Sequence, residues 1–359
     1  MSVASSLLMR AARREPVEHT PVWFMRQAGR VLPEYRAVRK DFTLMEIARR
    51  PELCAEVTLQ PVRRFGVDAA ILFADIMHPL AGVGVDLEIV DAVGPVIRTP
   101  VRSSAEVSAL RPLVTETDLP FVLDTIRILK KELGGKIPLI GFSGAPFTLA
   151  SYLIEGQASR DFLRTKTMMH SAPELWNDLM DCLTEIVIAY LKAQHVAGAD
   201  VLQLFDSWVG CLSPKDYASH VEPYCRRIFA ALDGSGTPLI HFGVNTGTLL
   251  PLMKDDGASV IGVDWRIPLD DAWDIIGHDK AIQGNLDPAI LLSSPEAIER
   301  EVRDVLRRAD GRPGHIFNLG HGLLPETPVD AVQRVVDVVH EAGHAPAPRD
   351  SRVPAGARR

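Results

Sequence analysis

The chain has 359 residues, 47% of them hydrophobic and 24% charged, so it carries enough apolar side chain for one large core. Its 39 basic and 46 acidic side chains leave a net charge of −7, which gives no general attraction to nucleic acid or to an anionic membrane. No apolar run reaches the roughly 18 residues of a transmembrane helix. The four cysteines, Cys54, Cys182, Cys211 and Cys225, show no CxxC spacing. Scattered cysteines of this kind fit a reducing cytoplasm and predict no zinc framework.

Short apolar segments alternate with longer amphipathic segments along the chain. We predict eight strands, at residues 22–25, 69–73, 138–142, 200–205, 239–242, 259–263, 281–284 and 315–319. Eight strands separated by helices favour an α/β fold, a single (β/α)8 barrel over residues 1–344. An open doubly wound sheet is the alternative, but no GxGxxG sequence follows the first strand.

Several helices have recognisable start signals. Thr43 and Glu46 form the pattern of a capping box before a helix that is predicted to run to about residue 64. A serine or threonine precedes a proline at 213–214, 294–295 and 327–328. This pattern predicts a capping hydroxyl followed by proline at the first helical position.

Two segments depart from the alternation of strands and helices. Residues 83–99 alternate apolar and polar side chains about a turn, which predicts a β-hairpin inserted after the second strand. Residues 345–359 are rich in proline, arginine and alanine without periodicity, and we predict a disordered C-terminal tail there.

A cluster of arginines follows the first predicted strand. Arg26, Arg30, Arg36 and Arg39 fall within fourteen residues, together with Gln27. Arginine is suited to planar, bidentate binding of carboxylates and phosphates. On a protein that is acidic overall, such a cluster indicates a small ligand with several negative charges.

Polar or ionisable side chains follow almost every predicted strand. Because the active sites of (β/α)8 barrels lie at the carboxyl ends of their strands, we expect these side chains to form one polar pocket. They are Arg26, Asp75, Ser143, Asp206, Ser207, His241, Asp264, Asn285 and His321.

Four of the residues after the third, fourth and eighth strands are candidates for ligand contacts. Phe142 could wall a flat ring, and Tyr152 could present its hydroxyl to the same pocket. Ser207 lacks the GxSxG context of a hydrolase nucleophile, so we interpret it as a hydrogen-bonding group. His321 lies between two glycines on a strand-end loop, where a histidine is more often functional than part of the core.

The motifs that contain these residues resemble the uroporphyrinogen decarboxylase family. The resemblance rests on residues 25–36, 73–76, 141–149, 205–207 and 318–322, in the family's order, and spans residues 15–342. It implies a cofactor-free, metal-free cytoplasmic homodimer of tetrapyrrole biosynthesis. The reaction would convert four acetate side chains of uroporphyrinogen III to methyls, giving coproporphyrinogen III and four CO2.

The family's functional positions are matched without substitution. They correspond here to Arg26, Gln27, Arg30, Arg39, Asp75, Tyr152, Ser207 and His321. The resemblance implies that all of them bind substrate and that Asp75, Arg26, Tyr152 and His321 are catalytic.

Chemistry suggests a role for some of these residues. We expect Asp75 to accept the four pyrrole N–H groups and to stabilise a cationic intermediate. We expect Arg26 to orient the reacting acetate and to shuttle its proton, although a guanidinium with a pKa above about 12 is a weak acid. Arg30 and Arg39 would hold other carboxylates.

Two other functions remain as alternatives. Zinc- or corrinoid-dependent methyltransferases share a related barrel and hold zinc with a His-x-Cys pair and a later cysteine. Here Gly243 follows His241 at the position of the pair's cysteine, and position 321 is a histidine, which counts against that zinc site. A non-catalytic tetrapyrrole-binding protein is the second alternative, and only an assay separates it from an enzyme.

Overall fold

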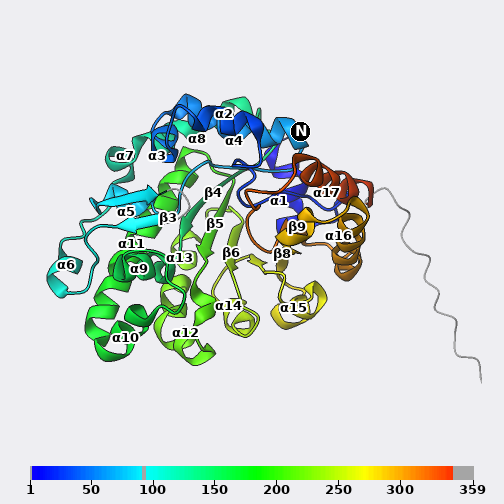
Figure 1. Cartoon of the computed structure of the whole chain (residues 1–359). Coiled ribbons are helices and arrows are strands. Elements are labelled where there is room, and N and C mark those ends of the chain that lie inside the picture. The colour runs from blue at the N-terminus through cyan, green and yellow to red at the C-terminus, as the bar shows by residue number, and fades with distance from the viewer. Residues whose placement is uncertain (1, 91–93, 343–359) are drawn as a thin grey trace, which may run out of the picture.

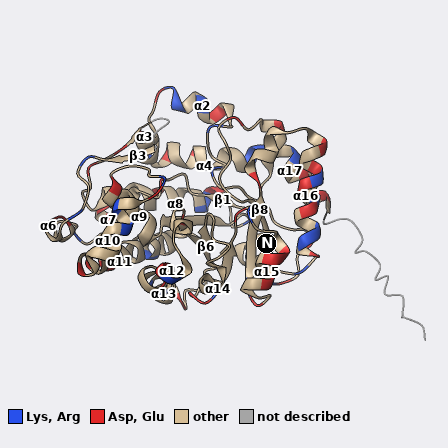
Figure 2. Cartoon of the chain, turned by 60° about the horizontal axis from the view of Figure 1, so that its bottom comes forward, with Lys and Arg blue, Asp and Glu red and all other residues tan. Residues whose placement is uncertain are grey.

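The computed structural model describes residues 2–90 and 94–342, so the predicted tail at 345–359 lies outside the described residues. Helices surround a parallel sheet, and the described ends of the chain lie near each other beside α17 (Figure 1). Charged residues lie mainly on outer helices such as α16, whereas the strands are almost free of them (Figure 2). None of the described helices combines the length and apolar composition that crossing a membrane requires.

Seven parallel strands follow one another around the barrel in the order β1-β4-β5-β6-β7-β8-β9. Their bounds are β1 Ala70–Ile71, β4 Leu139–Gly144, β5 Val201–Asp206, β6 Leu239–Gly243, β7 Val260–Gly262, β8 Ala281–Leu286 and β9 His315–Leu319. Each lies at a predicted position, with ends that differ by at most a few residues. The predicted (β/α)8-type fold is therefore confirmed.

The first strand, predicted at residues 22–25, is corrected. Residues 21–25, here named the closing segment, form only an isolated bridge. Val22 pairs with Phe317 of β9, and the Phe317 N–H donates to the Pro21 carbonyl at 2.8 Å. On the other side, the Asp68 N–H donates to the Val22 carbonyl, while the Asp68 carboxylate accepts the Val22 N–H, both at 2.8 Å. The closing segment thus fills the gap between β9 and β1.

Amide side chains of Gln27 and Asn318 replace some of the backbone hydrogen bonds that a regular strand would make in the closing segment. The Gln27 carbonyl Oε1 accepts the Phe24 N–H at 3.0 Å, and its Nε2 donates to the Ala69 carbonyl at 2.9 Å. The Asn318 Oδ1 accepts the Met25 N–H at 3.3 Å. Backbone groups that cannot reach a neighbouring strand are satisfied in this way, so the segment holds its place without regular strand pairing.

Helices cover the outside of the sheet. Their bounds are η1 Val3–Ser5, α1 Leu7–Ala12, α2 Pro33–Arg39, α3 Leu44–Ala48, α4 Pro51–Phe65, α5 His78–Gly82, α6 Ser104–Ser108, α7 Thr115–Asp118, α8 Pro120–Glu132, α9 Pro146–Glu155, α10 Leu163–Ser171, α11 Pro173–Ala197, η2 Val209–Cys211, α12 Pro214–His220, α13 Glu222–Leu232, α14 Leu250–Met253, α15 Leu269–Ile276, η3 Pro288–Leu292, α16 Pro295–Ala309 and α17 Val329–Ala342.

The predicted helix starts are confirmed in three of four cases. Thr43 and Glu46 form the capping box, and the hydroxyls of Ser213 and Ser294 cap α12 and α16. The helix predicted from 43 to 64 is corrected to α3 and α4, because Pro51 cannot donate a backbone hydrogen bond and starts a new helix. The Thr327 cap is wrong: α17 begins at Val329, and the buried Thr327 hydroxyl has no hydrogen-bond partner among the described residues.

A short chain of polar side chains crosses the interior of the barrel. The indole N–H of Trp23 donates to Gln283 at 3.1 Å, and the Gln283 amide donates to Gln203 at 3.2 Å. All three side chains are buried. These buried hydrogen bonds restrict the relative positions of β5, β8 and the closing segment, although the Gln203 Nε2 has no hydrogen-bond partner among the described residues.

The predicted hairpin is confirmed as β2 (Leu87–Val90) and β3 (Gly94–Ile97), which pair antiparallel. Its turn, including Val93, lies outside the described residues. The Ile97 N–H donates to the Gly156 carbonyl at 2.7 Å, which holds the hairpin against the end of α9.

Candidate active site

A cavity of about 460 Å³ lies at the carboxyl ends of the strands. Residues that follow β1, β5 and β9 line it, as do the loop after the closing segment and both strands of the hairpin. Seven of the residues that the sequence predicts to contact a ligand line this cavity: Arg26, Arg30, Asp75, Phe142, Tyr152, Ser207 and His321. The expected pocket is present, with the hairpin as a wall that sequence reasoning did not assign to it.

The backbone of the arginine loop is shaped around Arg26. Arg26 has φ 62°, which lies in the left-handed region that residues other than glycine rarely adopt. A Cβ at Gly29 would lie 2.8 Å from the Arg26 carbonyl oxygen, and one at Gly322 would lie 2.7 Å from the Arg26 Cγ. Gly29 therefore leaves room for the Arg26 carbonyl, and Gly322 leaves room for the exposed Arg26 side chain at the cavity.

The structure gives Gln27 a supporting contact rather than a place on the cavity wall. Its side chain is fully buried, and both ends of the amide are bonded to backbone groups of the closing segment and of the residue before β1. Gln27 thus fixes the arginine loop to the barrel. The sequence signal could not separate this role from ligand binding, because an amide suits both.

Arg39 lies in a second cavity of about 510 Å³, beside the first. Its guanidinium donates to the Phe42 carbonyl at 2.7 Å. Arg30 lines both cavities, and Arg49 lines the second one. Sequence reasoning missed Arg49, which comes after α3 and far from the arginine motif. The three arginines outnumber the two carboxylates that also line this cavity, Asp86 and Glu88, so it can bind carboxylate groups of a ligand.

Asp75 is held at its backbone and at one carboxylate oxygen. Its Oδ1 accepts the Met77 N–H at 2.9 Å, and its own N–H donates to the His78 Nδ1 at 2.8 Å. His78 is buried, and burial lowers its pKa, so its ring stays neutral beside Asp75. Because Asp75 lines the cavity, its carboxylate can accept a hydrogen bond from a ligand there.

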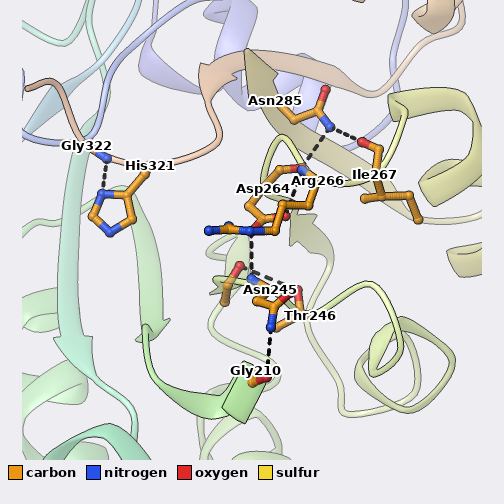
Figure 3. A network of polar contacts seen from close by, with 10 residues as sticks. Gly210, Asn245, Thr246, Asp264, Arg266, Ile267, Asn285, His321 and Gly322 are labelled. Carbon is orange, nitrogen blue, oxygen red and sulfur yellow. Dashed lines mark hydrogen bonds and ion pairs between the residues drawn. The ribbon is translucent and has the colours of Figure 1, made fainter. Parts of the chain in front are cut away.

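Tyr152 and His321 both keep an N–H or O–H donor near neutral pH. Burial and the neighbouring Asp75 raise the pKa of Tyr152 to about 12. Burial, reinforced by the charges of Arg26 and Arg266, lowers the pKa of His321 to about 4. The His321 Nδ1 accepts the Gly322 N–H at 2.7 Å (Figure 3), which leaves the proton of the neutral ring on Nε2.

Three phenylalanines form an aromatic floor in the cavity. Phe142 packs edge-on against Phe205 with ring centroids 5.3 Å apart, and Phe205 packs against Phe242 at 5.9 Å. All three line the cavity. Sequence reasoning named only Phe142, although Phe205 and Phe242 occupy partnered positions on neighbouring strands. The floor suits one face of a flat or domed ring.

The expectation that every strand end contributes to the pocket is wrong for five residues. Ser143, Asp206 and His241 are fully buried, and Asp264 and Asn285 bond to neighbouring loops instead (Figure 3). The Asp264 carboxylate accepts the backbone N–H of the loop after β6, and Asn285 donates to the carbonyls that follow β7. Asp264 and Asn285 thus hold strand-end loops in place. Ser143, Asp206 and His241 point away from the cavity, because alternate residues of a strand point to opposite faces.

The described residues contain three groups of histidine, cysteine and carboxylate side chains that could hold a metal ion. None of these groups lines the cavity.

Comparisons with known proteins place this geometry in a family. The family model described as "Uroporphyrinogen decarboxylase (URO-D)" matches residues 4–342. A uroporphyrinogen decarboxylase of Sorangium cellulosum is 56% identical over 338 residues, which is 94% of this chain and 96% of that protein. One from Thermus thermophilus is 56% identical over 341 residues, 95% of this chain and 99% of that protein.

Among solved structures, a methyltransferase from Methanosarcina mazei matches with a TM-score of 0.79 at 20% identity, over 95% of this chain and 99% of that one. At that identity the match concerns the fold alone. The family match and the sequence identities, in contrast, cover nearly the whole chain at more than half identical positions. The chain belongs to the uroporphyrinogen decarboxylase family.

Proposed function

We propose that the cavity decarboxylates the four acetate side chains of uroporphyrinogen III, giving coproporphyrinogen III and four CO2. The observation that carries this proposal is the arrangement of Arg26 and Asp75 around one cavity over the aromatic floor. A tetrapyrrole with eight carboxylates presents negative charge at its rim and four N–H donors at its centre. Arginines at the edge and one carboxylate facing the ring complement both features.

The two cavities would divide the substrate between them. The ring would lie on the phenylalanine floor of the first cavity, with its N–H groups directed to Asp75. Peripheral carboxylates would reach Arg30, Arg39 and Arg49 in the second cavity. Tyr152 and Ser207 line the first cavity and would donate hydrogen bonds to the remaining carboxylates.

Each decarboxylation needs a temporary acceptor for an electron pair. Protonation of a pyrrole α-carbon gives an iminium-like ring, and the C–C bond to the acetate carboxylate then breaks with its electrons passing into that ring. CO2 leaves, the exocyclic methylene carbon takes a proton to become a methyl, and the α-carbon proton is lost. The net change per acetate is uptake of one proton and release of one CO2.

The protein would act by placing charge. The Asp75 carboxylate would stabilise the cationic ring, and loss of one positioned group of this kind typically costs about 10²–10³ in rate. Arg26 would orient the reacting carboxylate and shuttle the proton that the reaction takes up. The neutral His321 would donate from Nε2, because its Nδ1 is occupied by a backbone N–H.

The test is anaerobic incubation of the full chain with uroporphyrinogen III in the presence of a chelator, followed by separation of products by carboxylate number. Products with seven, six, five and four carboxylates support the proposal. Asp75→Asn should bind substrate but lose about 10²–10³ in turnover. Unchanged substrate, with binding retained, would instead support the non-catalytic binding protein.

The Arg26→Lys variant tests whether the reaction needs the guanidinium group itself or only its positive charge. Lysine keeps the positive charge and loses the bidentate grip, so turnover should fall while the protein stays folded. Undiminished turnover would refute the role given to Arg26.

A zinc-dependent methyl transfer is the second candidate, because the methyltransferase of Methanosarcina mazei shares the fold. The described residues that line the cavity include no cysteine, and His241 is buried away from the cavity. Methyl transfer therefore has less support than decarboxylation.

The remaining parts of the proposal concern assembly and location. We propose a cytoplasmic homodimer in which residues 1–344 act as one catalytic unit. Four free cysteines are compatible with a reducing compartment. Light scattering of the purified chain at several concentrations tests the dimer, and a monomer throughout would refute it.

A further inference from the structure

The backbone that leads from β1 to Asp75 has little support from the sheet. β1 consists of Ala70–Ile71 alone, and its pairing with β4 ends where the Leu72 N–H donates to the Ile140 carbonyl at 3.0 Å. Asp75 comes after the end of this ladder. Sheet pairing alone therefore does not determine where the Asp75 carboxylate lies in the cavity.

Side chains of α4 take over the next hydrogen bonds of this backbone. The Phe73 N–H donates to the Thr58 Oγ1 at 3.0 Å, and the Phe73 carbonyl accepts the Cys54 thiol at 3.0 Å. The Thr58 hydroxyl donates its own proton to the Cys54 carbonyl at 2.9 Å, which leaves its oxygen as the acceptor. Burial raises the pKa of Cys54 to about 12, so the thiol keeps the proton that it donates. The chain is thus anchored to α4 as far as Phe73.

His78 makes the next contact, at Asp75 itself. The His78 Nδ1 lies 2.8 Å from the Asp75 amide nitrogen and 2.8 Å from the Asp75 carbonyl oxygen. That carbonyl also accepts the backbone N–H of His78 at 3.1 Å, whereas the Asp75 N–H has no other acceptor among the described residues. The His78 ring is buried and packs against Phe121, with ring centroids 6.0 Å apart.

These contacts indicate which ring nitrogen of His78 carries the proton. With the proton on Nε2, the Nδ1 accepts the Asp75 N–H, and only the Nε2 group lacks a partner in the described part of the chain. With the proton on Nδ1, both the Nε2 and the Asp75 N–H would lack one. Because unpaired buried polar groups are unfavourable, the structure favours the proton on Nε2. Although the contacts with Asp75 oppose it, burial lowers the pKa of His78, so the ring is neutral near pH 7.

A fixed Asp75 peptide also fixes the Asp75 carboxylate. Its Oδ1 accepts the Met77 N–H at 2.9 Å, which ties this oxygen to the turn before α5. Its Oδ2 makes no hydrogen bond to the described residues, and Asp75 lines the cavity. One carboxylate oxygen thus supports the loop, and the other is available to a ligand. A shift of the peptide would move both oxygens.

We propose that His78 is a positioning residue for Asp75: its unprotonated Nδ1 holds the Asp75 peptide so that the available carboxylate oxygen faces the substrate. This inference rests on the proposed function, because it concerns the rate of the same decarboxylation. His78 lines neither of the two cavities, so it would act on turnover through Asp75 and not on substrate binding. A misplacement of about 1 Å in a group that stabilises the reacting ring typically lowers the rate about 10²-fold.

Two substitutions separate the acceptor atom of His78 from the size of its side chain. His78→Leu fills similar space without an acceptor, whereas His78→Asn supplies an amide oxygen at the place of Nδ1. His195→Leu is the matched control, because the His195 Nδ1 is bonded to the Thr237 hydroxyl at 2.8 Å, before β6 and at the opposite end of the barrel from the cavity. Anaerobic turnover of uroporphyrinogen III gives kcat and KM, and thermal unfolding shows whether each variant is folded.

His78→Leu should lower kcat about 10–100-fold, with KM within about twofold of its value in the unaltered chain. His78→Asn should keep kcat within about threefold, and His195→Leu should leave kcat unchanged. An undiminished kcat in folded His78→Leu would overturn the proposal. Equal losses in His78→Leu and His78→Asn would overturn it too, because the acceptor atom would then not matter.

NMR of the unaltered chain with isotopically labelled histidine tests the inference without measuring activity. His78→Asn identifies the His78 signals, which report the protonation of each ring nitrogen. A neutral ring near pH 7, with its proton on Nε2 and a hydrogen-bonded Nδ1, is expected. A charged ring or a proton on Nδ1 would overturn the proposal even if the chain decarboxylates uroporphyrinogen III. If the ring is as expected but the unaltered chain leaves uroporphyrinogen III unchanged, the proposed function fails and the positioning role falls with it.

Discussion

Replacing Gly322 by alanine tests the position of Arg26 without removing any polar group from the cavity. A Cβ at position 322 would lie 2.7 Å from the Arg26 Cγ and closer still to its Cδ. Carbon atoms in ordinary contact are about 3.5–4.0 Å apart, so the arginine side chain would have to move by roughly 1 Å. The Gly322 backbone is outside the left-handed region, so alanine itself fits there.

A displacement of this size has a predictable cost if Arg26 orients the reacting carboxylate. A misplacement of about 1 Å typically lowers the rate about 10²-fold, which corresponds to about 2.7 kcal/mol in the activation barrier. The assay is anaerobic turnover of uroporphyrinogen III, with kcat/KM taken from the initial formation of the seven-carboxylate product.

Gly247→Ala is the matched control for this experiment. A Cβ at position 247 would meet only the Ile267 Cδ1 at 4.0 Å, an ordinary contact. Thermal unfolding of both variants shows that each is folded. If Gly322→Ala turns over substrate within about twofold of Gly247→Ala, the position of Arg26 does not control the reaction and the reasoning is refuted.

Three further predictions concern individual side chains. Tyr152→Phe should lower kcat/KM about 10–100-fold, because it removes a hydrogen-bond donor to a charged group of the substrate. Since the pKa of Tyr152 is raised to about 12, the pH–rate profile of the unaltered chain should show no titration of this tyrosine below about pH 10. The pKa of His321 is lowered to about 4 in the folded chain, so on acidification the unfolded chain takes up this proton at a higher pH than the folded chain. The free energy of unfolding should therefore fall as the pH falls from about 6.5 to about 4, by up to about 1.4 kcal/mol per pH unit. Urea unfolding of His321→Gln should show a weaker dependence of stability on pH, and an unchanged dependence would contradict the assignment. Arg49→Ala should raise KM several-fold with little change in kcat, whereas Arg50→Ala, its neighbour outside the second cavity, should change neither; equal effects would remove Arg49 from the substrate site.

The sequence was informative where one local signal determines the structure. The apolar run at 315–319 coincides with β9, and the capping box at Thr43 forms as predicted. Polar residues after the strands correctly located the cavity, because parallel strands bring their carboxyl ends to one edge. Asp75, Ser207 and His321 all line it.

The sequence was less informative where distant residues decide the outcome. The closing segment depends on side chains of Gln27 and Asn318, so its apolar run predicted a strand that has only one bridge. His241 was assigned to the pocket, but the alternation of strand side chains gives that place to Phe242. Arg49 lines the second cavity together with strand β2 of the hairpin, a contact between segments about forty residues apart that no local pattern predicts.

The closing segment joins β9 to β1 through one isolated bridge and a few side-chain contacts, and we expect this seam to open more easily than the ladders between regular strands. Local opening begins where few backbone bonds must break, so amide hydrogens of residues 21–25 should exchange with deuterium sooner than those of β5. Arg26 directly follows this segment, and Gln27 ties the two together. We therefore expect an anionic ligand bound by Arg26 to slow hydrogen exchange in the seam as well, so that closing the barrel and ordering the substrate site are coupled.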